Sequence, residues 1–532
     1  MSSTVVGTRH LARLMLRRDR LRLPVWLVGL GGVIAISALS VPPLYDTPEK
    51  VAGYASAVGA SPVSYLMSGR QAAIDTLDGI VANEVSQVAQ LGICLMVMFL
   101  VVRHTRTEEE SGRAELLRST VLGRHAATLA GLLYGAAAAL AIGLITTASM
   151  LLAGLDGLGS ATYGAGLVLL GLCYVAVTLV AVQLSTSARG ALGIAGTAIA
   201  LGYLVRGVGA LRDSALVWAS PFGWAQRLDA FGEERWWPAL PLVVLTAALL
   251  GLAGWLTGHR DFGSGVLPAR PGPPRAAPSL GTPVGLVLRL QRGLLLGWAV
   301  GLTALAVLYG AVIPTIPDLV ASNPDLAQVI GASDDAEQAL LDAFLGYILV
   351  FLAVISTGFV ITSVLRLRAE EASGRAEAVL TTRVRRSAWL GATVLVAGAG
   401  ALVLCLLMGL GLGLGSGLAT GEWDEVAAHV GAQLSYLPAV LLVAAIAVAL
   451  TAALPRWSLL AWAVLAFVFF QLLLSETLRL PGWIDGLSPF THLPQLPVEP
   501  FDAVPAVAEL VLAAALVGLA LWSYSRRDVA PG

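Results

Sequence analysis

The 532-residue sequence predicts an all-α integral membrane protein in which 12 transmembrane helices form two parallel six-helix repeats. Hydrophobic residues make up 57% of the chain and charged residues only 13%, about half the share found in soluble domains. Apolar runs of about 20 residues, the length that crosses a bilayer as a helix, recur from end to end. A charged ten-residue motif also occurs twice, at 106–115 and 368–377, with eight of its ten positions identical. Such a duplication predicts two homologous halves.

Hydropathy places six spans in each half. The first half carries them at 24–43, 85–103, 126–154, 163–186, 190–209 and 237–257. The second half carries them at 294–315, 341–365, 388–415, 429–453, 457–477 and 505–524. Six prolines between residues 258 and 283 predict a semi-rigid linker. The expected organisation is therefore a first six-span half at 1–257, a cytoplasmic linker at 258–283 and a second six-span half at 284–532.

Three further sequence features recur in the two halves. Trp26 near the first span corresponds to Trp298 near the seventh, and a Ser-Pro-Phe sequence at 220–222 returns at 488–490. Basic segments at 9–23 and 284–296 precede the first span of each half, and we expect both to lie in the headgroup plane before the chain turns into the bilayer. Because six is an even number, both halves start on the same side, so the repeats are parallel and not inverted.

The distribution of basic residues predicts the orientation. If the N-terminus is inside, 26 of the 33 lysines and arginines fall on the inner side, together with only ten of the 34 acids. Both termini, the linker and both copies of the charged motif are then cytoplasmic.

Residues suited to chemistry are scarce. The three cysteines lie inside apolar runs, and the six histidines lie at span edges or in loops without metal-ligand spacing. Lys50 is the only lysine, which excludes the Gly-Lys-Ser/Thr phosphate loop. The glycine-rich run at 409–415 is interpreted as a helix-packing feature. We therefore expect no cofactor, no metal and no enzymatic activity on this chain.

The charged motif is the most specific signal. Glu109 and Arg113, like Glu371 and Arg375, have the i,i+4 spacing that allows an ion pair on a helix. Gly112 and Gly374 are expected to break that helix by adopting positive φ. A solvated loop needs only to be polar, and that need alone would not keep Ser-Gly-Arg-Ala-Glu in the same order twice.

These paired motifs, the tryptophans and the Ser-Pro-Phe loops resemble the fused twelve-span ABC exporter permeases of the polyketide-antibiotic, or tetronasin-resistance, type. The resemblance covers essentially the whole chain. It implies a multi-pass protein of the bacterial cytoplasmic membrane that exports hydrophobic or amphipathic compounds such as antibiotics. It also implies two copies of a separately encoded ATP-binding subunit, which would hold ATP and Mg. The residues it assigns to ATPase coupling are Glu108, Glu109, Gly112, Arg113, Glu115, Glu370, Glu371, Gly374, Arg375 and Glu377.

The resemblance also places a substrate cavity between the halves, lined by the second, fifth, eighth and eleventh spans. Polar residues within those spans are the candidates, namely Gln87, Gln90, Thr197, Thr357 and Gln471. Polar residues in spans also bond across helices for packing alone. Two alternatives stay open. An ion-coupled secondary transporter would usually bury acids near the midplane, and a lipid-handling membrane protein would need acids or histidines clustered at one interface. A nucleic-acid partner is not expected, whereas membrane lipid is.

Overall fold

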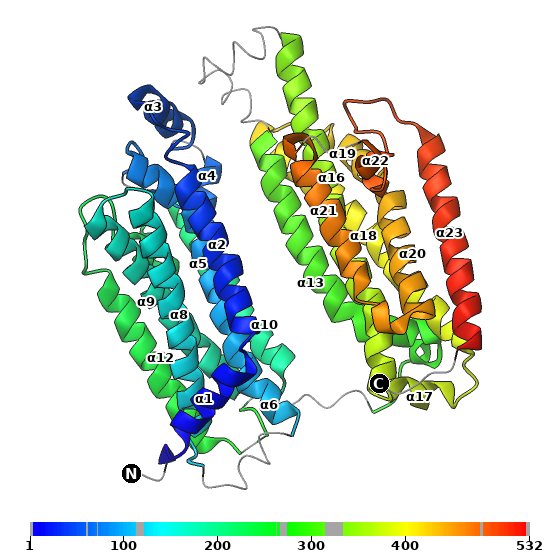
Figure 1. The fold of residues 1–532 in the computed structure, drawn as a ribbon, viewed down its shortest axis with the longest axis horizontal. Coiled ribbons are helices and arrows are strands. Elements are labelled where there is room, and N and C mark those ends of the chain that lie inside the picture. Colours follow the sequence, from blue (N-terminus) through cyan, green and yellow to red (C-terminus); the bar gives the residue numbers. More distant parts are fainter. Residues whose placement is uncertain are drawn as a thin grey trace. The chain divides into compact units, whose positions relative to one another are not determined.

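The computed structural model describes residues 4–59, 62–71, 73–112, 122–261, 263–266, 274–313, 334–478 and 482–527. Across these ranges the regular elements are all helices (Figure 1). The chain divides into two compact units, Met1–Gly272 and Pro273–Gly532, and this boundary falls inside the linker expected at 258–283.

The first unit is built around α9, which packs against four other long helices. These are α5 (Leu77–His104), α8 (Ala126–Leu152), α10 (Ala188–Leu211) and α12 (Ala239–His259) around α9 (Gly157–Leu184). The chain enters through α1 (Thr8–Arg18) and α2 (Arg22–Ser40), and both pack on α8. The short elements are α3 (Pro48–Ala57), α4 (Pro62–Met67), α6 (Arg106–Glu110), η2 (Ala215–Ala219) and α11 (Pro221–Gln226).

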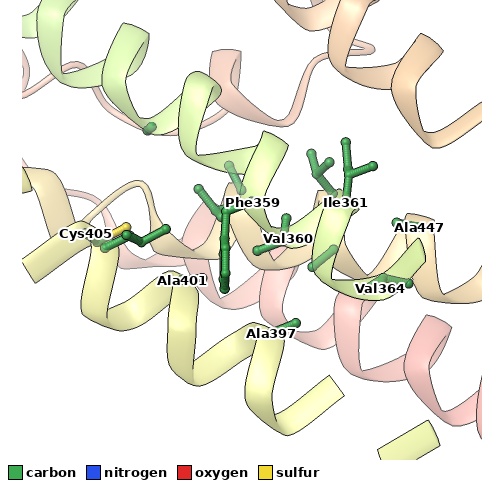
Figure 2. Packing of buried hydrophobic residues seen from close by; sticks show 14 of the residues in the cluster. Phe359, Val360, Ile361, Val364, Ala397, Ala401, Cys405 and Ala447 are labelled. Carbon is green, nitrogen blue, oxygen red and sulfur yellow. The ribbon is translucent and has the colours of Figure 1, made fainter. Parts of the chain in front are cut away.

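The second unit has α16 and α18 at its centre. Phe359 of α16 points toward Ala397 and Ala401 of α18 within one continuous apolar core (Figure 2). The long helices are α13 (Pro283–Val312), α16 (Asp334–Ala372), α18 (Arg386–Thr420), α20 (Leu437–Ala453), α21 (Leu460–Leu478) and α23 (Ala503–Arg526). The short ones are η3 (Pro278–Gly281), α17 (Arg375–Leu380), α19 (Val426–Leu434), η5 (Pro455–Trp457), α22 (Gly482–Asp485) and η6 (Pro489–Thr491).

Glycine allows α13 and α18 to approach closely. A Cβ added to Gly415 would lie 2.1 Å from the Val307 oxygen, and one added to Gly310 would lie 2.0 Å from the Leu412 oxygen. The glycine-rich run at 409–415 is therefore a helix-packing feature, as predicted.

Each predicted span range falls mainly on helix in the described residues, but the range 429–453 is divided between α19 and α20 at Ser435 and Tyr436. Eleven helices in the described part of the chain are long and apolar enough to cross a membrane. The predicted range 457–477 falls on α21, in which the apolar segment Leu460–Leu472 is shorter than the other spans. In the most apolar stretches of α12 and α13 only 17% of the residues are buried, so the described part of each unit leaves most of this apolar surface uncovered. The exact number of twelve spans stays a prediction.

The two entry segments differ, which corrects one expectation. In the first unit α1 ends at Arg18 and α2 begins at Arg22, so the chain turns between them as expected. In the second unit α13 runs without a break from Pro283 to Val312, so the turn expected at 284–296 is absent. Asp19, a poor helix former, occupies the break in the first unit. Its counterpart in the second unit, found with the spacing that separates Trp26 from Trp298, is Gln291, a good helix former.

Candidate functional site

The first copy of the charged motif begins directly after α5, with Arg106 as the first residue of α6. The Arg106 side chain is 1% exposed, and its Nη1 donates to Glu109 Oε2 at 2.5 Å. The other oxygen of Glu109 accepts a hydrogen bond from Arg260 Nη2, also at 2.5 Å. Arg260 directly follows the last residue of α12. Glu109 thus joins the end of α5 to the end of the last long helix in its unit.

The glutamates on either side of Glu109 contact two other helices. Glu108 Oε2 lies 2.7 Å from Arg18 Nη1 at the end of α1. Glu110 accepts a hydrogen bond of 2.9 Å from the N–H of Ala188, the first residue of α10, where a negative charge is favoured by the helix dipole. Three consecutive acids therefore connect α6 to α1, α12 and α10.

In the second copy, Glu371 occupies the motif position of Glu109. It lies in the last turn of α16 and is 1% exposed. Arg527 Nη2 donates to both of its carboxylate oxygens at 2.8 Å, and the Tyr524 hydroxyl donates to Oε1 at 2.7 Å. Arg368 Nη1 lies 3.5 Å from Oε2, in the i,i+3 relation that also joins Arg106 to Glu109. Arg527 directly follows α23, as Arg260 follows α12.

Both motif glycines have positive φ, which confirms the predicted break. The values are +73° for Gly112 and +74° for Gly374. After Gly374 the chain starts the separate helix α17 at Arg375. A residue with a side chain is disfavoured in this left-handed region, which explains why glycine stands there in both copies.

The predicted Glu371–Arg375 ion pair is wrong. The helix breaks between these residues, so the i,i+4 geometry does not form. Arg375 instead donates to Glu370, with Nε at 2.7 Å and Nη2 at 3.0 Å. The side chain of Glu377 is exposed. In the first copy Glu109 pairs with Arg106 and Arg260, while Arg113 and Glu115 lie outside the described residues.

Arg260 and Arg527 were not identified from the sequence. In the sequence each counts only toward the charge distribution. Their common signal was position: each is the first residue after the last span of its half. An arginine at both of these places could have been matched with the duplicated glutamate.

A buried acid outside the motif itself, Asp19, lies beside the first motif copy. Asp19 is fully buried and accepts from Arg103 Nε at 3.1 Å and from the Tyr134 hydroxyl at 3.0 Å, and His104 Nε2 lies 2.6 Å away. Burial alone would raise the pKa of Asp19, but the His104 and Tyr134 hydrogen bonds and the charge of Arg103 outweigh it and lower that pKa. Gln291, at the equivalent position in the second unit, hydrogen-bonds Ser363 instead.

Comparison with known proteins gives the family. The family model described as the C-terminal domain of multidrug efflux system permease Rv1217c matches residues 280–525. The multidrug efflux system permease protein Rv1217c of Mycobacterium tuberculosis (strain ATCC 25618 / H37Rv) is 35% identical over 532 residues, which cover 99% of this chain and 96% of that protein. The chain belongs to the multidrug efflux permease family. It is therefore a multi-pass transport subunit of a bacterial cell membrane.

The candidate cavity residues occupy different environments in the permease. Gln87 is half-buried and Thr197 is exposed. Gln90 is buried, donates to Ser86 at 3.3 Å and borders a cavity of about 30 Å³ within the first unit. Thr357 is buried and donates to Val354 O of its own helix at 2.6 Å, and Gln471 donates to Asp485 at 3.3 Å. No hydrogen bond in the described ranges joins any two of the five candidates.

One intramembrane acid of the permease was overlooked in the sequence. Glu509 lies within α23 and is 6% exposed, and neither carboxylate oxygen has a hydrogen-bond partner in the described part of the chain. The counterpart of Glu509 in the first unit, found with the spacing that separates Arg260 from Arg527, is Leu242. A buried carboxyl without a partner is costly and marks a functional candidate.

Proposed function

We propose that this permease is the membrane subunit of an ABC exporter that works with two copies of a separately encoded ATP-binding subunit. One observation carries the proposal: each half holds its motif glutamate against an arginine at the end of its last span, Glu109 against Arg260 and Glu371 against Arg527. A solvated loop has no need of the same glutamate–arginine attachment in both halves. A surface that must transmit force does need it.

The helices that carry the motifs are suited to transmit that force. In the proposed mechanism the partner subunits bind ATP and Mg and, on closing, push on α6 and α17. α5, a helix of 28 residues, ends just before the first motif copy, and α16, a helix of 39 residues, ends within the second copy. Displacement of either motif therefore moves a helix long enough to cross the bilayer.

The remaining assignments follow from the same proposal. The motifs, both termini and the linker face the cytoplasm, because 26 of 33 basic residues then lie inside. Substrates are hydrophobic or amphipathic compounds such as antibiotics, which enter a cavity between the halves. The permease is assigned to the polyketide-antibiotic, or tetronasin-resistance, type on the strength of its paired motifs.

Crosslinking tests the docking directly. Ser111 and Ser373 are exposed within the two copies, and the native cysteines are all buried. In permease co-expressed with its ATP-binding subunit, Ser111→Cys and Ser373→Cys should each crosslink to that subunit through a short bis-maleimide. Ser56→Cys, exposed on α3 at the opposite end of the first unit, is the matched control (Figure 1). Co-purification of the ATP-binding subunit with crosslinks from Ser56→Cys alone would refute docking at the motifs.

Glu509 favours a second candidate, ion-coupled transport. A carboxyl that loses and regains a proton in the membrane would have the burial that this residue has. The two candidates differ in energy source. In proteoliposomes containing both subunits, ATP alone should drive export by the parent and by Glu509→Gln. Export driven by a pH gradient without ATP, and lost in Glu509→Gln, would favour ion coupling.

A further inference from the structure

A cavity of about 440 Å³ lies in the first unit beside the first motif copy. One wall is apolar and comes from α1 and the residues before α8. The polar wall comes from the α5–α6 junction and the end of α12, together with Arg18 of α1 and Arg124 from the residues before α8. Leu11, Leu14, Met15 and Leu122 line the apolar wall, and Arg18, Glu108, Arg124 and Arg260 are the principal charged groups. This volume falls within the range of about 300–1,000 Å³ that is typical of small-molecule sites.

The second unit has filled the equivalent space. Arg124 donates to the carbonyl oxygen of Arg260, and Arg386 donates to that of Arg527. The spacing between Arg124 and Arg386 is the spacing between the two motif copies, so the two sites correspond. At that offset Trp389 stands where the first unit has Ala127. Trp389 is 2% exposed, whereas Ala127 is exposed and lines the cavity. Only about 20 Å³ remains beside Trp389.

A second difference concerns charge. Arg18 of the cavity corresponds to Leu290, at the offset that relates Trp26 to Trp298. Glu108 has its counterpart in Glu370, so the acid is kept while the arginine is lost. The first unit therefore has the space and an arginine on the α1 side, whereas the arginine of the second site is Arg366, at the position of His104.

Three arginines and three acids line the cavity, and guanidinium groups already hold two of the acids. Glu109 is shared by two guanidinium groups, those of Arg106 and Arg260, and Glu108 is matched by Arg18. Arg124 donates only to carbonyl oxygens, those of Thr257 at 3.0 Å and Arg260 at 3.1 Å. The remaining acid of the lining, Asp261, is exposed.

The start of α8 adds to this preference. Ala126, Ala127 and Thr128 form its first turn and line the cavity, and no side chain caps this end of the helix. A helix N-terminus favours negative charge. Together with Arg124, whose guanidinium group donates only to carbonyl oxygens, it makes the polar wall suited to an anionic group.

We propose that this cavity binds one amphipathic anion, a phosphate or carboxylate joined to an apolar chain. Arg18 and Arg124 hold the anionic group near the start of α8, and the chain lies against Leu11, Leu14 and Leu122. An anionic phospholipid of the adjoining leaflet and a free fatty acid share this chemistry. The ligand contacts Arg18, the partner of Glu108, so its binding acts on the motif. The proposal concerns binding alone and does not depend on docking of an ATP-binding subunit.

The test measures binding of four probes to the purified full-length permease in neutral detergent, by native mass spectrometry. The probes are dioleoylphosphatidylglycerol, oleate, dioleoylphosphatidylcholine and inorganic phosphate. The parent should retain one copy of dioleoylphosphatidylglycerol or oleate at least tenfold more tightly than dioleoylphosphatidylcholine or phosphate. The tighter of the two anions identifies the source. Equal retention of anionic and zwitterionic lipid, or of phosphate and the amphipathic anions, would overturn the proposal.

The second part of the test uses variants that introduce residues of the second unit at the corresponding positions of the first. Ala127→Trp should fill the cavity and lower anion retention at least tenfold. Ala137→Trp, exposed on the same helix and outside the lining, should leave retention unchanged. If Ala127→Trp does not fold, Arg18→Leu should produce the same loss from an exposed position, and Arg18→Lys should restore most of it. Unchanged retention in a folded Ala127→Trp or in Arg18→Leu would refute the site.

Discussion

Arg527 holds its Nη2 atom 2.8 Å from both carboxylate oxygens of Glu371, from the position directly after the last helix of its unit. Its Nη1 also donates to the Thr451 oxygen at 3.0 Å, so one guanidinium group joins α16, α20 and α23. Arg260 has the same place in the first unit, where it joins Glu109 to Gln183 of α9. The duplication thus preserved a three-dimensional contact whose two residues are far apart in the chain.

Loss of the Glu371 charge should destabilise the second unit. In Glu371→Gln, Arg527 and Arg368 face a neutral amide at a site that is 1% exposed. Breaking a buried ion pair by removing one partner costs about 3–5 kcal/mol. We expect a lower thermal unfolding temperature and less monodisperse protein after detergent extraction, as measured by fluorescence-detected size exclusion.

Glu377→Gln is the matched control for this variant, because it removes an exposed acid of the same motif copy. Such a surface change should alter stability by no more than about 0.5 kcal/mol. Equal unfolding temperatures for the two variants would show that the Glu371–Arg527 pair contributes nothing to stability.

Gly374→Ala should distort the second motif copy. Its φ of +74° places an alanine in the left-handed region, at a cost of roughly 1–2 kcal/mol. No atom lies within 4 Å of the added methyl group, so backbone strain is the only source of the effect. The expected outcome is a measurable loss of thermal stability together with weaker ATP-binding subunit co-purification.

Gly391→Ala tests the reasoning with the same chemical change inside α18. This glycine is helical, and an added methyl group there also meets open space. Alanine in a helix is favoured over glycine by roughly 0.5–1 kcal/mol, so this variant should be unchanged or slightly more stable. A Gly374→Ala protein as stable as Gly391→Ala would argue against a conformational need for glycine.

The helices and the motif breaks could be predicted because their causes are local. Apolar run length alone placed every long helix, and glycine alone indicated the positive φ at Gly112 and Gly374. The pairing of Glu371 was predicted wrongly because i,i+4 spacing presumes a continuous helix. The bend that the same glycine causes moves Arg375 to Glu370.

Other features depend on contacts between distant segments. Arg260 and Arg527 lie about 150 residues after the glutamates they pair with, at a separation that no local pattern encodes. The cavity beside Ala127 required the positions of α1, α8 and α12 together. Aligning the two halves of the sequence shows that Trp389 corresponds to Ala127. The alignment does not show that this difference leaves a cavity in the first unit and fills it in the second.

Asp19 should make the stability of the permease depend on pH in acid. Its pKa is lowered in the folded protein, below the ordinary value of about 4 for an aspartate. A lowered pKa contributes stability that is fully present above the ordinary value and is lost as pH falls through the folded-state value. The unfolding temperature of the parent should exceed that of Asp19→Asn at pH 7, and the difference should shrink below about pH 4. A difference that grows toward acid pH would contradict this sign.

Arg375→Ala should damage export more than folding. The Arg375 side chain is 65% exposed, and its pair with Glu370 is a surface ion pair, worth about 0–1 kcal/mol. The variant should therefore insert and accumulate normally. If the ATP-binding subunit docks here, truncating a buried charged contact at that interface costs about 2–5 kcal/mol, which weakens docking by well over tenfold. Export and substrate-stimulated ATP hydrolysis should fall, and the double variant with Arg113→Ala should lose more than either.

Arg456→Ala is the control for this experiment. Arg456 is an exposed arginine of η5, in the same unit but outside both motif copies, and is assigned to the same side of the membrane. Its removal changes the net charge equally but touches no docking residue, so export should be retained. Normal co-purification of the ATP-binding subunit and unchanged export in the Arg113→Ala, Arg375→Ala double variant would reduce the repeated motif to a solvated loop. Equal losses in Arg456→Ala and Arg375→Ala would instead indicate a general effect of positive charge on the cytoplasmic face.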